Sequence, residues 1–502
     1  MKYRSYRDQW REHLRQGNFA QLKNLPKQIA LSFLDHHYYN DQYRNDYIDL
    51  LCEIALSSEQ ALLRHTASSA LFGIIVEGLC DDFEEWNTHI YNRVLSQVVT
   101  NYRQTEQGQQ IDQELKNFGL HSFDDFFNRI ETIRAASDEP KYDQLEYPEK
   151  ILLLSRVTLG ADVAITSIII QYMQDLFPES EIVIIGGPKL HDLFGGNSRV
   201  NIKHVDYSRR GALAERLDSW HNLREAIDSE SSHLPAEKIL VVDPDSRLSQ
   251  LGLFPVVRNS PYLFFDSRGK SIHPRHLSMA ELANHWLNNV FGQTRHYYPQ
   301  VWLEEKTLQQ SRDAVQVLRD SGAERIISIN LGVGGNDRKR LSNAAEKKLI
   351  HALLATPRTV IILDKGAGQE EQKRIEAVVE AVKHQNEDTY DSEFDNLEQE
   401  CRISHGLLCV SAGIGEMAAL ISCSDEYIGY DSACQHIAAA FGVPICTIFA
   451  GTNDPDFVRR WRATGPEAIS IVHVDTLTTP AMFTDDDIVA RVIHARNEEF
   501  QQ

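Results

Sequence analysis

The spacing of apolar residues changes its character once along the chain. Up to about residue 135, apolar residues recur three and four positions apart, as in YIDLLCEIAL and SALFGIIVEGLC. This is the period of an amphipathic helix. Strand-like runs with alternating valine and isoleucine are absent from this part, and proline is nearly absent. We therefore expect residues 1–135 to form an all-helical N-terminal domain.

A short segment at 136–150 combines two prolines with many charged residues, which is typical of a linker between domains. Beyond it, short continuous apolar runs alternate with amphipathic stretches that are long enough for helices. Continuous runs of this length are typical of strands covered on both faces. The runs are ILLLSRV, EIVIIGG, KILVVD and YLFF in a first block, and RIISINLG, TVIILD, LLCVSA, EYIGY, PICTIFAG and ISIVHV in a second.

Strands that alternate with helices predict βαβ units and parallel sheets. The sequence therefore predicts an α/β protein with two Rossmann-like lobes, at 151–305 and 306–502, preceded by the helical domain. Within the second lobe, the acidic segment 386–400 is predicted to be a surface loop. The stretch DDDIVARVIHARNEEF is predicted to be a closing helix, because acidic residues fill its first turn.

Charge and composition narrow the classes of partner. The chain has 502 residues and a formal net charge of -21, and so acidic a surface repels nucleic-acid phosphates and anionic lipid heads. No apolar run is long enough to cross a bilayer, and the first residues lack the apolar stretch of a secretory signal. We expect a cytoplasmic protein with no nucleic-acid partner and no integral membrane segment. Its seven cysteines show no CxxC pair and are expected to be reduced and buried.

Ligands of open parallel sheets bind beyond the carboxyl ends of the strands, so the loops there carry the candidate chemistry. In RVTLGADVAIT, Asp162 follows the first strand of the first lobe, where a helix is predicted to begin. Such an aspartate can deprotonate a hydroxyl in the cleft, or it can simply cap the helix. The position alone leaves both roles open.

A second loop, INLGVGGNDRKRL, is rich in glycine and ends in the cations Arg338, Lys339 and Arg340. Glycines let backbone amides approach phosphate oxygens, and cations neutralise them. The alternative is a solvated loop. The pattern GxxxxGK[ST] is missing, so the loop is not a P-loop.

A third stretch, YIGYDSACQHIAAAFGVPICTIF, places Asp431 and Ser432 at the start of an alanine-rich helix. The N-terminus of that helix offers free amides and a positive dipole to a pyrophosphate. The alternative is that both side chains serve only as helix caps. His436 lies four residues after Ser432 and faces either the cleft or the sheet.

Two other patterns carry less weight. Gly413 and Gly415 form a G-x-G-x-x-A pattern, which alone is weak evidence for a dinucleotide site. Asp243 and Asp245 imitate the DxD of metal-dependent sugar transferases, but two carboxylates do not make a metal site.

Together the three loops resemble those of the heptosyltransferase-like glycosyltransferases, the lipopolysaccharide heptosyltransferase family with the two-lobed GT-B fold. RVTLGADVAIT is similar to the family pattern R-L-x-x-x-G-D-V-V-L-T, and GGNDRKRL to a loop with G-x-S and K-R-W. The stretch from Asp431 to Phe449 follows D-[ST]-G-x-x-H-[LI]-A-A-A-x-G-V-P. The resemblance covers about residues 148–500. Ala161 and Ala433 replace family glycines, and Leu341 replaces the tryptophan.

The resemblance implies an inverting, metal-independent transfer of a sugar, with a heptose as one option, from a nucleotide-diphosphate donor to an acceptor hydroxyl. It needs no cofactor. It makes Asp162 the catalytic base in an acceptor-binding first lobe. It places the donor on the second lobe, at Arg338, Lys339, Glu370, Asp431, Ser432, Ala433, Cys434 and His436.

The acceptor stays open among a glycan, a lipid-linked sugar and a polypeptide. One alternative is a protein-modifying glycosyltransferase whose helical domain holds a polypeptide. The other is a non-catalytic binding protein of the same fold, which the alanines at 161 and 433 would favour.

Overall fold

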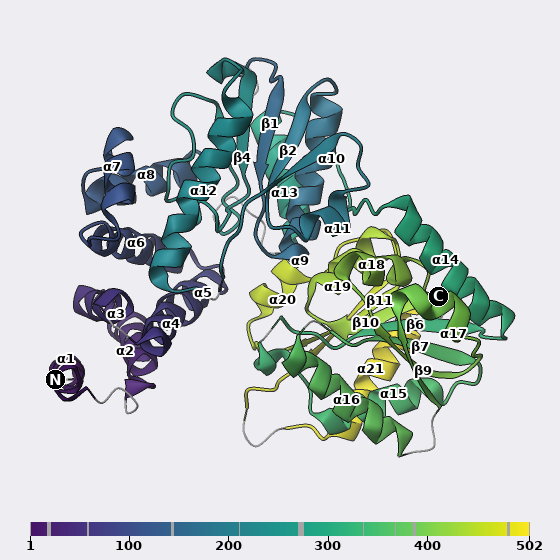
Figure 1. Ribbon diagram of the computed structural model, residues 1–502. Coiled ribbons are helices and arrows are strands. Elements are labelled where there is room, and N and C mark those ends of the chain that lie inside the picture. The colour runs from purple at the N-terminus through teal and green to yellow at the C-terminus, as the bar shows by residue number, and fades with distance from the viewer. Residues whose placement is uncertain are drawn as a thin grey trace.

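A computed structural model of the chain shows an N-terminal group of helices followed by two lobes, each built on a parallel sheet (Figure 1). It describes residues 2–17, 22–57, 60–141, 145–209, 211–269, 276–334, 336–366, 368–384, 388–478 and 482–500. Within these ranges, no helix is both long enough and apolar enough to cross a membrane.

The described residues before 142 form helices and no strand. Three consecutive segments, α4, η2 and α5, continue one another between residues 61 and 80, with a π-helical turn in the middle. The elements are α1 (Lys2–Gln16), α2 (Leu25–Asn40), α3 (Asn45–Ser57), α4 (Ala61–Ser69), η2 (Ala70–Val76), α5 (Glu77–Cys80), α6 (Glu85–Tyr102), α7 (Gln109–Asn117) and α8 (Phe123–Ala135).

The first lobe holds a parallel sheet in the order β3-β2-β1-β4-β5. Its strands are β1 (Lys150–Leu154), β2 (Glu181–Gly186), β3 (Val200–His204), β4 (Ile239–Asp243) and β5 (Tyr262–Phe264). The helices are α9 (Leu159–Ala161), η4 (Asp162–Thr166), α10 (Ser167–Leu176), α11 (Leu190–Phe194), α12 (Leu213–Ser231), η5 (Ala236–Lys238) and α13 (Met279–Phe291).

The second lobe holds a larger parallel sheet in the order β12-β11-β10-β6-β7-β9-β8. Its strands are β6 (Arg325–Asn330), β7 (Thr359–Asp364), β8 (Thr389–Glu393), β9 (Gly406–Ser411), β10 (Glu426–Tyr430), β11 (Ile445–Ala450) and β12 (Ile469–Val474). The helices are α14 (Glu305–Asp320), η6 (Asp337–Lys339), α15 (Asn343–Leu354), α16 (Gln369–Lys383), η7 (Phe394–Asn396), α17 (Leu397–Glu400), α18 (Ile414–Ser422), α19 (Ala433–Ala440), α20 (Pro455–Trp461) and α21 (Asp485–Phe500).

The predicted fold class is confirmed: the protein is α/β, with two Rossmann-like lobes behind a helical region. The predicted surface loop at 386–400 is wrong in part, because β8, η7 and α17 lie within it. Residues 386 and 387 fall outside the described residues. The sequence also gave no sign of β3. Both missed strands lie at the edge of a sheet, where exposed side chains can be polar, as in VNIKH and TYDSE.

One hydrophobic core joins the N-terminal helices to the first lobe. Leu152 and Leu154 of β1 pack in the same cluster as Trp10, Phe126 and Trp220, which come from α1, α8 and α12. The alternate residues of β1, Ile151 and Leu153, belong to a second cluster that reaches into the second lobe. The helices therefore cover one face of the first sheet. The domain division at 135 and 150 stays a prediction.

Candidate functional site

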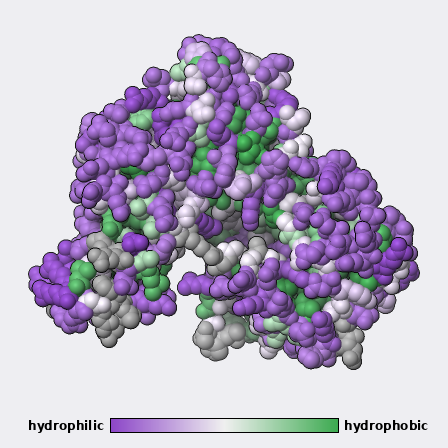
Figure 2. All heavy atoms as spheres, in the orientation of Figure 1, coloured by the Kyte–Doolittle hydropathy of each residue, from purple (hydrophilic) through white to green (hydrophobic). Residues whose placement is uncertain are grey.

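A cavity of about 400 Å³ lies between the two lobes, at the carboxyl ends of their strands, and this volume is within the range of small-molecule sites. Three parts of the chain line it. The first lobe supplies the loop 156–161, the second lobe supplies Lys339 and the start of α19, and the helical region supplies α5. In the space-filling view, a notch separates the N-terminal helices from the second lobe on a mainly hydrophilic surface (Figure 2).

The second-lobe wall carries polar atoms that are buried without a partner. Ser432 stands at the N-cap position of α19, but its hydroxyl makes no cap hydrogen bond. Among the described residues, neither Ser432 Oγ nor His436 Nδ1 has any hydrogen-bond partner, and both residues line the cavity. Burial lowers the pKa of His436 to about 4, so the imidazole is neutral at pH 7. Buried polar groups are normally paired, so these two unpaired atoms make this wall a candidate binding site.

Lys339 faces the same wall from η6. Its ammonium pairs with Asp431 and lies 5.3 Å from the centre of the Phe457 ring. Asp431 also accepts a hydrogen bond of 2.8 Å from Gln435 Nε2. The cation is thereby held beside the N-terminus of α19, where the helix dipole adds positive potential.

The two lobes come close where the first-lobe loop meets α19. A side chain at Gly160 would place its Cβ 3.2 Å from Ala433 Cα and 3.4 Å from His436 Cδ2. That is tighter than ordinary van der Waals contact, so glycine lets the loop lie against the helix. The contact sets the separation between the predicted acceptor and donor walls.

Asp162 lies behind this loop and does not line the cavity. It is 1% exposed, and its carboxylate accepts hydrogen bonds from Ser155 Oγ at 2.8 Å, the Arg156 amide at 2.7 Å and Thr166 Oγ1 at 2.8 Å. Burial raises its pKa to about 6, against these hydrogen bonds. The predicted role as a helix cap is not what the structure has, since the carboxylate holds the loop before it. Its role as the base stays a prediction.

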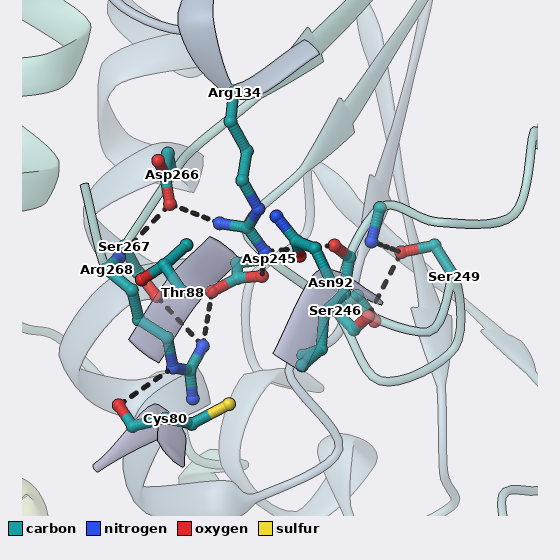
Figure 3. A network of polar contacts seen from close by, with 12 residues as sticks. Cys80, Thr88, Asn92, Arg134, Asp245, Ser246, Ser249, Asp266, Ser267 and Arg268 are labelled. Atoms are coloured by element: carbon teal, nitrogen blue, oxygen red, sulfur yellow. Dashed lines mark hydrogen bonds and ion pairs between the residues drawn. The ribbon is translucent and has the colours of Figure 1, made fainter. Parts of the chain in front are cut away.

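A buried network of arginines and aspartates stands beneath the first-lobe wall (Figure 3). Arg134 of α8 and Arg268 approach Asp245 from opposite sides, and Arg156 lies 3.6 Å from the same carboxylate. Although burial opposes ionisation, the three guanidinium groups lower the pKa of Asp245.

Both carboxylates of the DxD pattern therefore already bind other groups of the protein. Asp245 pairs with arginine, and Asp243 accepts hydrogen bonds from the Ser246 amide and the Tyr262 hydroxyl. Over the part of the chain that the structure describes, no group of three or more histidines, cysteines or acidic residues could hold a metal ion.

Three other predicted donor residues lie away from the cavity surface. Arg338 and Glu370 are exposed and do not line it, because η6 and the first turn of α16 direct them outward. The neighbouring Glu371 points inward instead and accepts a hydrogen bond from the Val333 amide. Cys434 is buried in the core, so only its backbone amide is available to a ligand.

The G-x-G-x-x-A pattern has a packing role. A side chain at Gly415 would place its Cβ 2.7 Å from the backbone oxygen of Asp192, so this glycine lets α18 approach α11 across the two lobes. Gly413 precedes α18, and its amide donates to Glu416 at 2.6 Å. The pattern therefore marks a contact between the lobes.

The structure adds cavity residues that the sequence did not single out. Glu77 and Asp81 come from the helical region, and Arg209, Arg247 and Arg268 come from the first lobe. No motif surrounds them. In the sequence, the two acidic residues stand out only as charges beside an apolar helix, in IIVEGLCDD. Such charges are equally typical of an ordinary exposed helix face.

Two parallel-sheet lobes that meet at a cavity, with a helix N-terminus and a lysine on one wall, are the arrangement of the GT-B fold. Residues 364–479 match the sequence model of glycosyltransferase family 9 (heptosyltransferase). The chain is accordingly a glycosyltransferase similar to the heptosyltransferases. Among curated proteins, none matches it in sequence.

Several solved structures are similar to the chain. A glycosyl transferase family 9 protein from Veillonella parvula is 16% identical over 71% of this chain and 98% of its own, with a TM-score of 0.50. The Escherichia coli heptosyltransferase WaaC with ADP is 13% identical, over 69% and 99%, with a TM-score of 0.46. The Escherichia coli ADP-heptose lps heptosyltransferase II is 12% identical, over 70% and 99%, with a TM-score of 0.44.

Proposed function

We propose that the protein transfers a sugar from a nucleotide-diphosphate donor to an acceptor hydroxyl, with inversion at the anomeric carbon and without a metal ion. The observation that carries the proposal is the pair of unpartnered buried atoms, Ser432 Oγ and His436 Nδ1, beside the ammonium of Lys339. A hydroxyl, a neutral imidazole and a cation at one helix N-terminus form a site for a diphosphate.

The donor diphosphate would lie against the start of α19. There the first-turn amides of Ala433 and Cys434 would face it, and Ser432 Oγ, which makes no cap hydrogen bond, would donate one to a phosphate oxygen. Lys339 would share its charge between Asp431 and the diphosphate. Negative charge builds on the leaving diphosphate during transfer, and fixed donors of this kind stabilise it in place of a metal.

In a single displacement, the acceptor oxygen attacks the anomeric carbon on the face opposite the leaving diphosphate, so the configuration inverts. The hydroxyl must lose its proton to a base on the acceptor wall. The resemblance to the heptosyltransferases assigns this role to Asp162 and includes a heptose among the candidate sugars. The acceptor is a glycan, a lipid-linked sugar or a polypeptide.

A thermal-shift series tests the donor site. The protein is heated with ADP, UDP, GDP or CDP and with the matching monophosphates. We expect one diphosphate to raise the melting temperature more than its monophosphate, since the second phosphate adds contacts with Lys339 and α19. The nucleotide sugar that contains this diphosphate should then release it equally well in the presence of Mg²⁺ and in the presence of EDTA. No shift with any nucleotide would contradict the proposal, and loss of release in EDTA would contradict its metal independence.

A further inference from the structure

The helical region reaches the cavity through the end of one helix. The helix that runs through α4, η2 and α5 ends at Cys80, and Glu77 and Asp81 from this end line the cavity. The Asp81 side chain is exposed to the cavity. Within the described ranges it makes neither a hydrogen bond nor an ion pair. A carboxylate from the N-terminal helices therefore stands free in the space between the lobes.

Contacts with the first lobe fix the position of this helix end. Arg268 donates a hydrogen bond of 3.2 Å to the Cys80 carbonyl, directly before Asp81, and also pairs with Asp245 (Figure 3). One turn earlier, Glu77 pairs with Arg247 at 3.1 Å and Arg209 at 3.2 Å. Buried or ion-paired partners on two sides keep the backbone of Asp81 in place without occupying its carboxylate.

The carboxylates on the cavity wall are Glu77, Asp81, Asp245 and Asp431. Glu77 and Asp245 are each paired with arginines, and Asp431 is paired with Lys339. Asp162, the base that the resemblance predicts, lies behind the wall with three hydrogen bonds. A base must reach the proton that it removes, and geometry is the first criterion. Of these carboxylates, Asp81 lines the cavity and has no ion-pair or hydrogen-bond partner among the described residues.

The surroundings of Asp81 also suit a base. Enclosure by the protein raises its pKa, and Glu77 adds to this effect. Arg268, Arg247 and Lys339 act against it. Lys339 on the donor wall and Asp81 from the helical region line the same cavity.

We propose that Asp81 is the catalytic base on the acceptor side: it accepts a hydrogen bond from the attacking hydroxyl and takes its proton. The acceptor oxygen forms its bond to the anomeric carbon as the bond from that carbon to the diphosphate oxygen breaks. The electron pair leaves with the diphosphate, and the proton ends on Asp81. Asp162 is then a positioning residue that holds the loop at 155–157. This assignment rests on the proposed function.

Asp81→Asn in the full chain tests the assignment. The donor is the nucleotide sugar that gives the largest thermal shift, and the acceptor is water, whose attack also needs a base. We expect diphosphate release to fall at least ~100-fold, the lower end of what general-base catalysis supplies. The thermal shift with the nucleotide diphosphate should be unchanged. Sodium azide attacks as an anion with no proton to lose, so azide-dependent release should be retained.

The azide readout separates a base from a residue that shapes the site. Asp82→Asn is the matched control, because Asp82 is the next residue, lies outside the cavity lining and accepts the Glu84 amide at 3.1 Å. It should leave both rates unchanged. Asp162→Asn should change the water and azide rates by the same factor. Loss of the water rate alone in Asp162→Asn would return the base role to Asp162 and overturn ours.

Two failures can be told apart. If the wild type binds nucleotide diphosphate and releases it from the sugar, but Asp81→Asn does so at the wild-type rate, the assignment of Asp81 is wrong and the proposed function stands. If the wild type neither binds nor releases any nucleotide diphosphate, the proposed function is wrong and the Asp81 base falls with it.

Discussion

Lys339 and Arg338 are neighbours on η6, yet only Lys339 faces the cavity. Substituting each residue in turn therefore distinguishes a direct contact with the ligand from a general effect of positive charge. Lys339→Ala should weaken binding of the nucleotide diphosphate roughly 10- to 100-fold, because a hydrogen bond to a charged group contributes about 1.5–3 kcal/mol. Titration calorimetry measures the change. Arg338→Ala is the matched control and should bind as the wild type does; an equal loss in both variants would point to general electrostatics.

Asp245 is the centre of a buried charge cluster, so its loss should destabilise the fold. Asp245→Asn leaves the guanidinium groups of Arg134, Arg156 and Arg268 without their shared carboxylate. Removing one partner of a buried ion pair costs about 3–5 kcal/mol. Urea unfolding at pH 7 should show that loss. Asp228→Asn is the control, because Asp228 is 62% exposed beside Arg224, and it should change stability by less than about 1 kcal/mol.

The loss in Asp245→Asn should depend on pH in a definite direction. The arginines lower the folded-state pKa of Asp245, so the unfolded state binds more protons as the pH falls. The stabilisation is therefore complete above the unfolded pKa of about 3.9 and shrinks below it. The difference between wild type and variant should be equal at pH 7 and 5 and smaller at pH 3. A constant difference at all three values would show that folding does not lower the pKa of Asp245.

At the scale of elements, the loops after the strands could be predicted, because each carries its own local pattern. The alanine-rich start of α19 and Lys339 on η6 both line the cavity, and their role in donor binding stays a prediction. The edge strand β8 could not be predicted, since its exposed polar residues imitate a loop. Asp81 could not be predicted either. A charged residue after an apolar helix has no signature until the fold places it on the wall of the cavity that the start of α19 also lines.

The contact between α18 and α11 offers a test of how closely the lobes fit. Gly415→Ala would bring a methyl group 2.7 Å from the Asp192 carbonyl oxygen, and such overpacking costs about 1–3 kcal/mol. In an unobstructed helix the same change would gain up to about 1 kcal/mol. A lower free energy of unfolding in urea would therefore indicate the close contact, and a higher one would indicate that the helix is unobstructed. Gly413→Ala, where the nearest atom is 3.5 Å away, should be tolerated.

For the whole molecule, the shared core predicts that the helices do not unfold ahead of the first lobe. Hydrogen exchange followed by mass spectrometry should give α3, α6 and β1 a common free energy of opening, because their buried residues belong to one cluster. A lower value for α3 and α6 than for β1 would contradict this and would make the helices an independent folding unit.

The same shared core limits how this protein can be re-engineered. Trp220 of α12 donates a hydrogen bond of 2.8 Å to the Pro255 carbonyl, and Arg129 of α8 donates one of 2.9 Å to the Leu253 carbonyl. The helices, α12 and the segment 244–269 thus fit one another as a set. A chimera that exchanges residues 1–135 alone would expose apolar surface on the first lobe. Grafting the helical region onto another two-lobed transferase would require α12 and that segment to move with it.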